Sequence, residues 1–243
     1  MMVQSNDTTD KYWKGVGCGI HRSDVICSIV GYMVDAGESL EYGKNHDGYW
    51  NGEMFVKQLQ EKIIPTFECL HGPEYQVLFL IDNSQGHSAY AEDVLAVSRM
   101  NVNPGGKQAC MRNGWFTYNG VQVEQEMVFT LNHPHFPNQP KGLYESKLCG
   151  KCIKCNPDST ACCNKHILEV QPDFQQQRSS IQEVIENAGH LCIFLPKFHC
   201  ELNFIEYFWG KVKKYLQDNC NGTFNTLKTN MPLAMQSVQL STI

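Results

Sequence analysis

The chain has 243 residues, a formal net charge of −5 and 42% hydrophobic residues, enough apolar material for a real core, which excludes a wholly disordered protein. No stretch approaches the roughly 18 uncharged apolar residues of a transmembrane helix, and the N-terminus has no secretory signal, so we expect an intracellular protein with reduced cysteines and no membrane contact. The mild acidity argues against a protein that holds nucleic acid by bulk charge alone.

Three elements are predicted in the first third of the chain. The mixed segment 20–31 is a candidate strand. Apolar residues at near-helical spacing predict a helix over 52–70, which Pro65 should end or kink because proline lacks the backbone N–H and crowds the preceding turn. The unbroken apolar run in YQVLFLID predicts a strand over 75–82 that is buried on both faces.

The middle of the chain is predicted to contain less regular structure. We expect a helix over 89–100, followed by a loop-like region over 101–140 with Pro-Gly-Gly at 104–106. No acidic residue occurs from Val94 to Val123. That stretch therefore carries local positive charge although the chain as a whole is acidic.

The last third is predicted to return to alternating elements. Ser180 and Glu183 have the spacing of a capping box, and Gly189 is suited to end the helix expected over 180–188. The run LCIFL predicts a second buried strand over 191–195. The strongest helix prediction covers 203–217, whose apolar residues form one stripe: Phe204, Ile205, Phe208, Trp209, Val212, Tyr215 and Leu216. The alternation favours a mixed α/β sheet.

Three carboxylates are candidates for a functional site. Asp82 ends a predicted buried strand, the place where ligands gather in open α/β sheets, although an aspartate there also serves to cap a turn. Glu206 falls just outside the apolar stripe of its helix, beside Gly210, and the alternative is a solvated pair with Lys213 or Lys214. Asp24 is less distinctive, since by pattern alone two other aspartates, Asp35 and Asp47, are equal candidates.

At these residues the chain resembles the catalytic core of mariner-type DDE transposases, and more narrowly a fungal transposase-derived group. The resemblance covers most of residues 20–243. Its specific signatures are the Asp82-Asn83 pair followed by His87, and the block from Asn203 to Trp209. The segments that carry it are LIDNSQGHSAYAEDVLAVSRMN (80–101), FLPKFHCELNFIEYFWGKVKKYL (194–216), EYGKNHDGYWNGEMFVKQL (41–59) and PGGKQACMRNGW (104–115).

The resemblance implies a ribonuclease-H-like fold in a single domain, 1–243, with a five-stranded mixed sheet and helices on both faces. In that family the first acid lies on the first strand, the second at the end of the fourth strand and the third on a late helix. The matching positions here are Asp24, Asp82 and Glu206, expected to converge as catalytic residues on two Mg²⁺ or Mn²⁺ ions.

The activity implied is cleavage of a DNA phosphodiester, followed by attack of the freed 3′-hydroxyl on target DNA. DNA is the implied partner, with self-association, a nuclear location and no small-molecule organic cofactor. His87 is expected to orient a water or a phosphate, or else to bond to the backbone at a helix start. The supporting residues of the motif are Asn83, His87, Asn203 and Trp209.

Five of the twelve cysteines form a cluster with the spacing C-x2-C-x2-C-x6-C-C: Cys149, Cys152, Cys155, Cys162 and Cys163. Four thiolates or histidines satisfy a tetrahedral structural zinc, and His166 is a sixth candidate. The alternative is a loop of free thiols. The second and third acids are farther apart than is usual in the family, so 102–172 is interpreted as an insertion that carries this cluster.

The cations expected to contact DNA are bunched rather than spread over the chain. They are Arg99, Lys107, Arg112, Lys211, Lys213 and Lys214. Bunched cations bind phosphates locally whatever the net charge. The net charge of −5 therefore does not exclude DNA.

The chain also departs from the family pattern. A helix-turn-helix module that recognises transposon ends does not fit into the residues before Asp24, and relatives continue beyond the final residues STI. The expectation is a truncated copy whose activity is in question. Two hypotheses follow: a metal-dependent DNA-cleaving and strand-transferring core, or a catalytically silent remnant that binds nucleic acid or protein. A weaker third is a zinc-dependent binding module centred on 149–163.

Overall fold

The computed structural model describes residues 2–7, 18–43, 50–84, 87, 90–143 and 164–239. Contacts divide the chain into two compact units. The first unit joins Met1–Ala89 to Ser179–Ile243, and the second is Tyr90–Arg178. The 102–172 segment, which was expected to be an insertion, falls inside the second unit. Each unit has its own buried core.

The first unit is built on a mixed sheet, in agreement with the expected α/β class. Its strands, in chain order, are β1 (Met2–Asp7), β2 (Gly19–Cys27), β3 (Gly31–Tyr32), β4 (Glu38–Tyr42), β5 (Leu78–Ile81) and β8 (Leu191–Phe194). Strand β1 is antiparallel to β2 and parallel to β5, and β5 is parallel to β8. The sheet thus has an antiparallel half and a parallel half that meet at β1.

Six strands occupy five positions across this sheet. Residues His21 to Ile26 of β2 pair with β1 along one edge. The short strands β3 and β4 pair with successive stretches of β2, so both lie along its other edge. A turn of 3-10 helix at Val34–Ala36 joins them. The candidate strand 20–31 therefore becomes β2, a turn and the start of β3.

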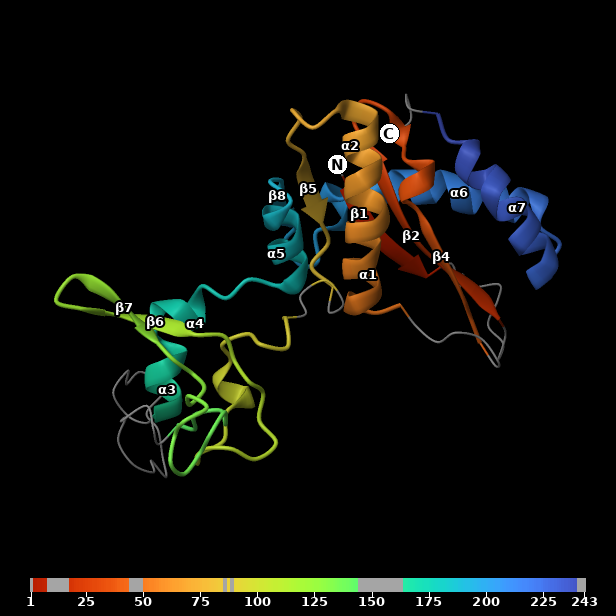
Figure 1. Cartoon of the computed structure of the whole chain (residues 1–243). Helices are drawn as coiled ribbons and strands as arrows, with labels where there is room; N and C mark the ends of the chain where they lie inside the picture. The colour runs from red at the N-terminus through yellow and green to blue at the C-terminus, as the bar shows by residue number, and fades with distance from the viewer. Residues whose placement is uncertain are drawn as a thin grey trace. The chain divides into compact units, whose positions relative to one another are not determined.

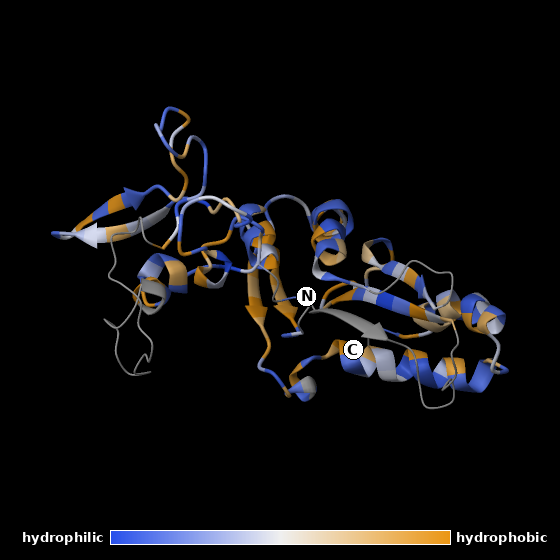
Figure 2. Ribbon diagram, turned by 90° about the horizontal axis from the view of Figure 1, so that it is seen from below, coloured by the Kyte–Doolittle hydropathy of each residue, from blue (hydrophilic) through white to orange (hydrophobic). Residues whose placement is uncertain are grey.

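Helices cover both faces of the sheet (Figure 1). On one face, α1 (Gly52–Gln58), α2 (Ile64–His71) and α5 (Ser180–Asn187) pack against alternate sheet residues that include Val25 and Phe79. On the other, α6 (Ile205–Asn219) and α7 (Phe224–Gln236) pack against Ile20 and Ile26. Figure 2 shows hydrophobic and hydrophilic residues side by side along the helices, as expected for helices with one buried side.

Pro65 does not end the helix predicted over 52–70. A π-helical turn at Leu59–Ile63 joins α1 to α2, so the helical path continues to His71. Within this wider turn the backbone N–H of Ile64 donates to Leu59 O, five residues back. Pro65 stands in the first turn of α2, where a missing N–H is tolerated.

The helix and strand expected over 180–195 both form, with two corrections. The N-cap is Ser179 rather than Ser180, and its side chain accepts from the Gln182 N–H at 3.2 Å. Gly189 follows the end of α5 and has φ +82°, a conformation that glycine tolerates without strain. Strand β8 is only half buried, because Leu191 and Ile193 are 49% and 51% exposed. The apolar run of β8 therefore predicts a more buried strand than the structure contains.

The second unit contains a hairpin, short helices and turns. They are β6 (Gly114–Tyr118), β7 (Val121–Gln125), α3 (Asn164–Glu169), α4 (Pro172–Gln175) and a 3-10 turn at Val97–Arg99. The core of the unit is formed by Leu95, Val97, Met111, Met127, Leu168 and Phe174. This core draws on segments far apart in the sequence, which explains how a unit with little regular structure becomes compact.

Two sequence predictions fail in this unit. The helix expected over 89–100 is absent: Asp93 O accepts from Arg112 N at 2.8 Å, and Leu95 N donates to the Gln177 side chain at 3.3 Å. These tertiary bonds take the place of helical ones. The loop-like region 101–140 contains the β6–β7 hairpin, whose turn at Asn119-Gly120 has positive φ at both residues. Asn-Gly between β-favouring residues is a known hairpin signal, and it was missed.

Among the described residues, no helix is both long enough and apolar enough to cross a bilayer.

The strongest helix prediction, 203–217, forms as α6, preceded by a 3-10 turn at Cys200–Leu202. Its buried stripe is Ile205, Phe208, Trp209, Val212 and Leu216. Phe204, assigned to this stripe, is instead 51% exposed. The next helix, α7, follows after a short connection.

Acidification is expected to destabilise the first unit through His190. This side chain is 5% exposed, lies between the rings of Phe67 and Phe79, and neither ring nitrogen has a hydrogen-bond partner among the described residues. Burial lowers the pKa of His190, although Glu68, at 3.9 Å, opposes the shift. As the pH falls, His190 is therefore protonated in the unfolded chain before it is protonated in the folded protein. The folded state begins to lose stability as the pH falls through about 6.5, the ordinary pKa of histidine.

The measurement is the free energy of unfolding of the wild type and of His190→Phe between neutral pH and pH 5. The variant keeps an aromatic ring between Phe67 and Phe79 but cannot be protonated. We expect the wild type to lose stability more steeply than the variant over this window. Parallel curves for the two proteins would contradict the assignment to His190.

Candidate functional site

Asp24 lies in the middle of β2, where it pairs with Gln4 of β1. Arg22 precedes it by two residues on the same strand, so both side chains share one face. The Arg22 guanidinium donates from Nε to Asp24 Oδ2 at 3.0 Å and from Nη2 to Oδ1 at 2.5 Å. The Tyr32 hydroxyl donates to Oδ1 at 3.1 Å. Both oxygens of the Asp24 carboxylate are thus engaged by protein donors.

This cluster is buried, and its electrostatics are those of an internal ion pair. The Asp24 side chain is fully buried and that of Arg22 is 15% exposed. Burial raises the pKa of Asp24, while the charge and hydrogen bonds of Arg22 act in the opposite direction. Burial, together with the Asp24 carboxylate, also raises the pKa of Tyr32. A pair of this kind holds its geometry because either partner alone would be a buried, uncompensated group.

The backbone around Asp24 is fixed from two sides. Gly37 approaches so closely that an added Cβ would overlap with Asp24 Oδ1 and Arg22 Nη2. Gln58 of α1, itself buried, donates from Nε2 to Ser23 O at 3.0 Å and to Ala36 O at 2.8 Å. The amide of Gln58 therefore ties β2 to the turn that carries Gly37.

Asp82 directly follows β5, where the sequence predicts it. Its side chain is 25% exposed, and Asn83 beside it is half buried. Asp82 Oδ1 is bonded to Nδ1 of His87, which also lies 3.2 Å from Asp82 O. Both partners are acceptors, so Nδ1 carries the proton. The other ring nitrogen, Nε2, is buried without a partner among the described residues.

His87 is held in place by packing as well as by Asp82. Its side chain is 1% exposed, and its ring centroid lies 4.4 Å from that of Phe55 in α1. The His87 N–H donates to Ser84 O at 3.2 Å. Of the two alternatives for this histidine, the bond to the backbone is found, whereas the orientation of a water or a phosphate stays a prediction.

Glu206 lies in the first turn of α6 and is half exposed. Its N–H donates to Asn203 O at 2.9 Å. Asn203 is 3% exposed, and no hydrogen-bond partner for its Oδ1 is found in the described part of the chain. Gly210, one turn after Glu206, is exposed, and a Cβ there would meet nothing within 4 Å. Trp209 is fully buried in the core beneath α6.

The three acids do not form a recognisable metal-binding group in the described residues. Across the described residues, no group of three or more His, Cys, Asp or Glu side chains is arranged to hold a metal ion, and Asp24, Asp82 and Glu206 are all described. Asp24 also lies on the second strand, whereas the resemblance implies the first. Continuing the β1–β5 register puts Asp82 level with Gln4, two strand spacings or about 10 Å from Asp24.

The cysteines 149, 152, 155, 162 and 163 lie outside the described residues, as does Asp47. The same holds for the side chain of His166. The expected zinc cluster therefore stays a prediction. Asp35, the other aspartate considered beside Asp24, is exposed in the turn before Gly37.

The cations expected to contact DNA fall into two groups. In α6, Lys211 is exposed and Lys213 half exposed, while Lys214 pairs with Asp218 at 2.8 Å. In the second unit, Lys107 is exposed, Arg112 pairs with Asp93 at 2.6 Å, and Arg99 donates to the carbonyls of Ala91 and Glu92 at 2.7 and 3.1 Å.

Sequence reasoning missed Arg22 and Tyr32. A local signal for Arg22 existed, because residues two apart on a strand share a face and these two carry opposite charges. Tyr32 contacts Asp24 from the neighbouring strand β3, and no residue spacing in the sequence predicts that contact.

The chain was compared with protein-family models, with curated proteins and with solved structures, and none of them matches it.

Proposed function

We propose that the chain is a DDE-transposase-derived domain with a ribonuclease-H-like fold that binds nucleic acid without cleaving it. The order and directions of the strands support this fold. Strand β2 is antiparallel to β1, β5 is parallel to β1, and β8 is parallel to β5. The position of Asp82 after β5 and of Glu206 on a late helix agrees with the family layout.

The observation that carries the proposal is the engagement of Asp24 by Arg22 and Tyr32. A divalent cation at Asp24 would have to reach a side chain that is fully buried and whose two oxygens already accept hydrogen bonds from Arg22 and Tyr32. The guanidinium of Arg22 would also repel a second cation. The residues present therefore do not fit the two-metal site that the resemblance implies, and Asp24 acts as half of a structural ion pair.

An outward-facing stripe on α6 supports nucleic-acid binding. Tyr207, Lys211 and Lys214 follow each other at helical spacing and are all exposed. Lysines on such a stripe contact phosphates, and an exposed tyrosine offers a ring on which a base can stack. A nuclear location would follow from DNA as the partner.

Metal-dependent DNA cleavage and strand transfer is the second candidate. The observation that favours it is the pairing of Asp82, which keeps some solvent exposure, with the buried His87, whose Nε2 has no hydrogen-bond partner among the described residues. For this activity Asp24 would have to leave Arg22, or another acid would have to take its place.

The test combines a cleavage assay with a binding assay. The wild type and Glu206→Gln are incubated with supercoiled plasmid and Mg²⁺ or Mn²⁺, and binding to duplex and single-stranded oligonucleotides is followed by fluorescence anisotropy over a range of salt concentrations. We expect binding without nicking. Replacing Lys211 and Lys214 by Gln should lower the salt dependence of binding by about one unit of slope per lysine.

Lys57→Gln provides the matched control. This lysine is 70% exposed on α1, on the other face of the sheet from α6. The control should bind like the wild type. Nicking by the wild type that is lost in Glu206→Gln would overturn the proposal in favour of the enzyme, and no nucleic-acid binding at any salt concentration would overturn both.

A further inference from the structure

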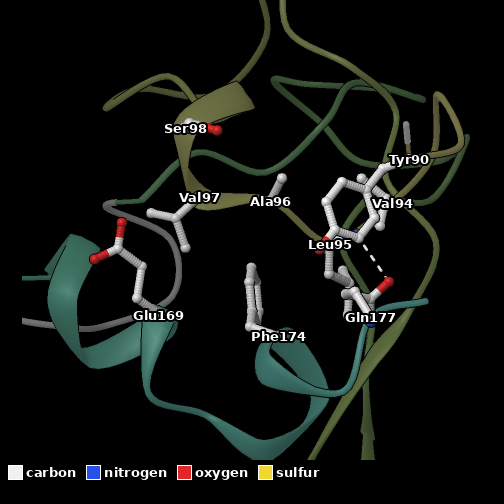
Figure 3. Close-up of a pocket in the computed structure, with 9 residues that line it drawn as sticks. All are labelled: Tyr90, Val94, Leu95, Ala96, Val97, Ser98, Glu169, Phe174 and Gln177. Carbon is white, nitrogen blue, oxygen red and sulfur yellow. Dashed lines mark hydrogen bonds between the residues drawn. The ribbon is translucent and has the colours of Figure 1, made fainter. Parts of the chain in front are cut away.

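The second unit contains a pocket lined by residues from three separate segments (Figure 3). Its volume is about 220 Å³, and it lies between the segment 94–98 and the helices α3 and α4. The lining residues are Tyr90, Val94, Leu95, Ala96, Val97, Ser98, Glu169, Phe174 and Gln177. Pockets for drug-sized ligands span roughly 300–1,000 Å³, so this one suits a single ring system.

The walls of the pocket are aromatic and aliphatic, and they are held in position. Figure 3 shows the ring of Phe174 standing beneath the chain at Ala96, with Tyr90 and Gln177 at one end of the pocket and Glu169 at the other. The Gln177 side chain accepts from Leu95 N at 3.3 Å and donates to Asp173 O at 2.6 Å. Gln177 therefore braces the wall.

The polar groups of the pocket define the charge of a suitable ligand. Among the described lining residues, Glu169 alone carries a charge, and none is a lysine or an arginine. A phosphate or carboxylate inside the pocket would thus meet no opposite charge and would face a carboxylate. A group that donates hydrogen bonds is favoured, because a carboxylate has several acceptor positions and can serve a ligand as well as a protein partner.

We infer that this pocket binds one nucleobase that carries an amino group, from single-stranded nucleic acid. The inference rests on the proposed nucleic-acid binding and deepens it. Phe174 and Tyr90 offer rings for stacking, and Glu169 accepts from an exocyclic amino group, as carboxylates do with the amino group of cytosine.

Positive charge stands outside the pocket, where the phosphates of such a strand would run. Arg99 directly follows the lining residue Ser98, and its Nη1 is fixed by the carbonyls of Ala91 and Glu92. Its other guanidinium nitrogens have no partner among the described residues. A guanidinium anchored in this way is suited to a phosphate next to the bound base.

The experiment compares three labelled single strands of equal length and charge in anisotropy titrations with the full chain. They are oligodeoxycytidylate, oligothymidylate and a strand of abasic sites. We expect oligodeoxycytidylate to bind about ten-fold more tightly than the abasic strand, since stacking and one base-edge hydrogen bond are both lost. Tyr90→Ala and Phe174→Leu should each remove most of this difference, and Glu169→Gln should reduce the preference for cytosine over thymine.

Tyr118→Ala is the matched control, because Tyr118 is an exposed aromatic residue of the same unit, at the end of the β6–β7 hairpin and outside the lining. It should bind like the wild type. Tyr90 is half exposed, so its truncation tests the pocket even if Phe174→Leu unfolds the unit. Equal binding of all three strands, or no binding of any of them by a chain that still binds duplex DNA, would overturn the pocket inference alone. No binding of single strands or duplex would overturn the proposed function with it.

Discussion

Replacing Arg22 by methionine is expected to destabilise the first unit by about 3–5 kcal/mol, the usual loss when one partner of a buried ion pair is removed. Asp24 is fully buried, so without Arg22 its carboxylate keeps the Tyr32 hydroxyl as its one side-chain donor among the described residues. Methionine fills the space of the arginine stem but cannot donate. The loss should therefore come from the uncompensated charge rather than from a cavity.

The dependence on pH distinguishes these two causes. Burial raises the pKa of Asp24, and the variant lacks the guanidinium that opposes this rise. The folded variant then binds a proton more tightly than the unfolded chain, whose aspartate titrates near about 3.9. Stability of the variant is therefore fully present below about pH 4 and is lost as the pH rises through the raised pKa. A cavity would destabilise equally at every pH.

Urea unfolding at several pH values measures both effects. A Trp115→Phe background leaves only tryptophans of the first unit, so that fluorescence follows this unit alone. Adding Asp24→Asn to Arg22→Met should recover most of the loss at neutral pH, because an amide carries no charge to compensate. A double variant no more stable than Arg22→Met would contradict the ion-pair account.

The parts of the fold that could be predicted from the sequence are those decided by local pattern. The helix α6 is one, since its apolar stripe buries Phe208 and Trp209 whatever the rest of the chain does. Strand β5 is another, because the apolar run before Asp82 predicts a strand, although the strand covers only Leu78–Ile81 and one of its faces is not fully buried, since Leu78 is 40% exposed. The expectation that the 52–70 helix ends at Pro65 was wrong, since the helical path continues through a π-helical turn into α2, with the proline in the first turn of α2.

The parts that failed depend on distant residues. Whether 89–100 forms a helix is decided by Arg112 and Gln177, which take backbone bonds that a helix would use. The role of Asp24 is decided by Tyr32 on another strand as much as by Arg22. A carboxylate in a strand reads equally well as a metal ligand and as half of an ion pair, and only its neighbours in space separate the two chemistries.

Gln58 is the second residue whose replacement should have a large effect, because it fixes the backbone on which the Arg22–Asp24 pair depends. Its side chain is 3% exposed, and its Nε2 satisfies the carbonyls of both Ser23 and Ala36. Gln58→Leu leaves these two buried acceptors without a donor. At about 1–3 kcal/mol for each unsatisfied group, we expect a loss of about 2–6 kcal/mol that does not vary with pH.

Gln58→Glu separates the loss of the donor from the arrival of charge. An ionised glutamate cannot donate, and it would stand buried against two carbonyl oxygens, so its pKa in the folded protein must lie well above the unfolded value of about 4.3. The folded state then holds the proton more tightly. The variant should accordingly approach the stability of Gln58→Leu below about pH 4 and fall below it as the pH rises. If the stabilities of the two variants instead change in parallel from acidic to neutral pH, residue 58 is open to water. The hydrogen bonds of Gln58 to Ser23 O and Ala36 O would then not hold the Asp24 segment in place.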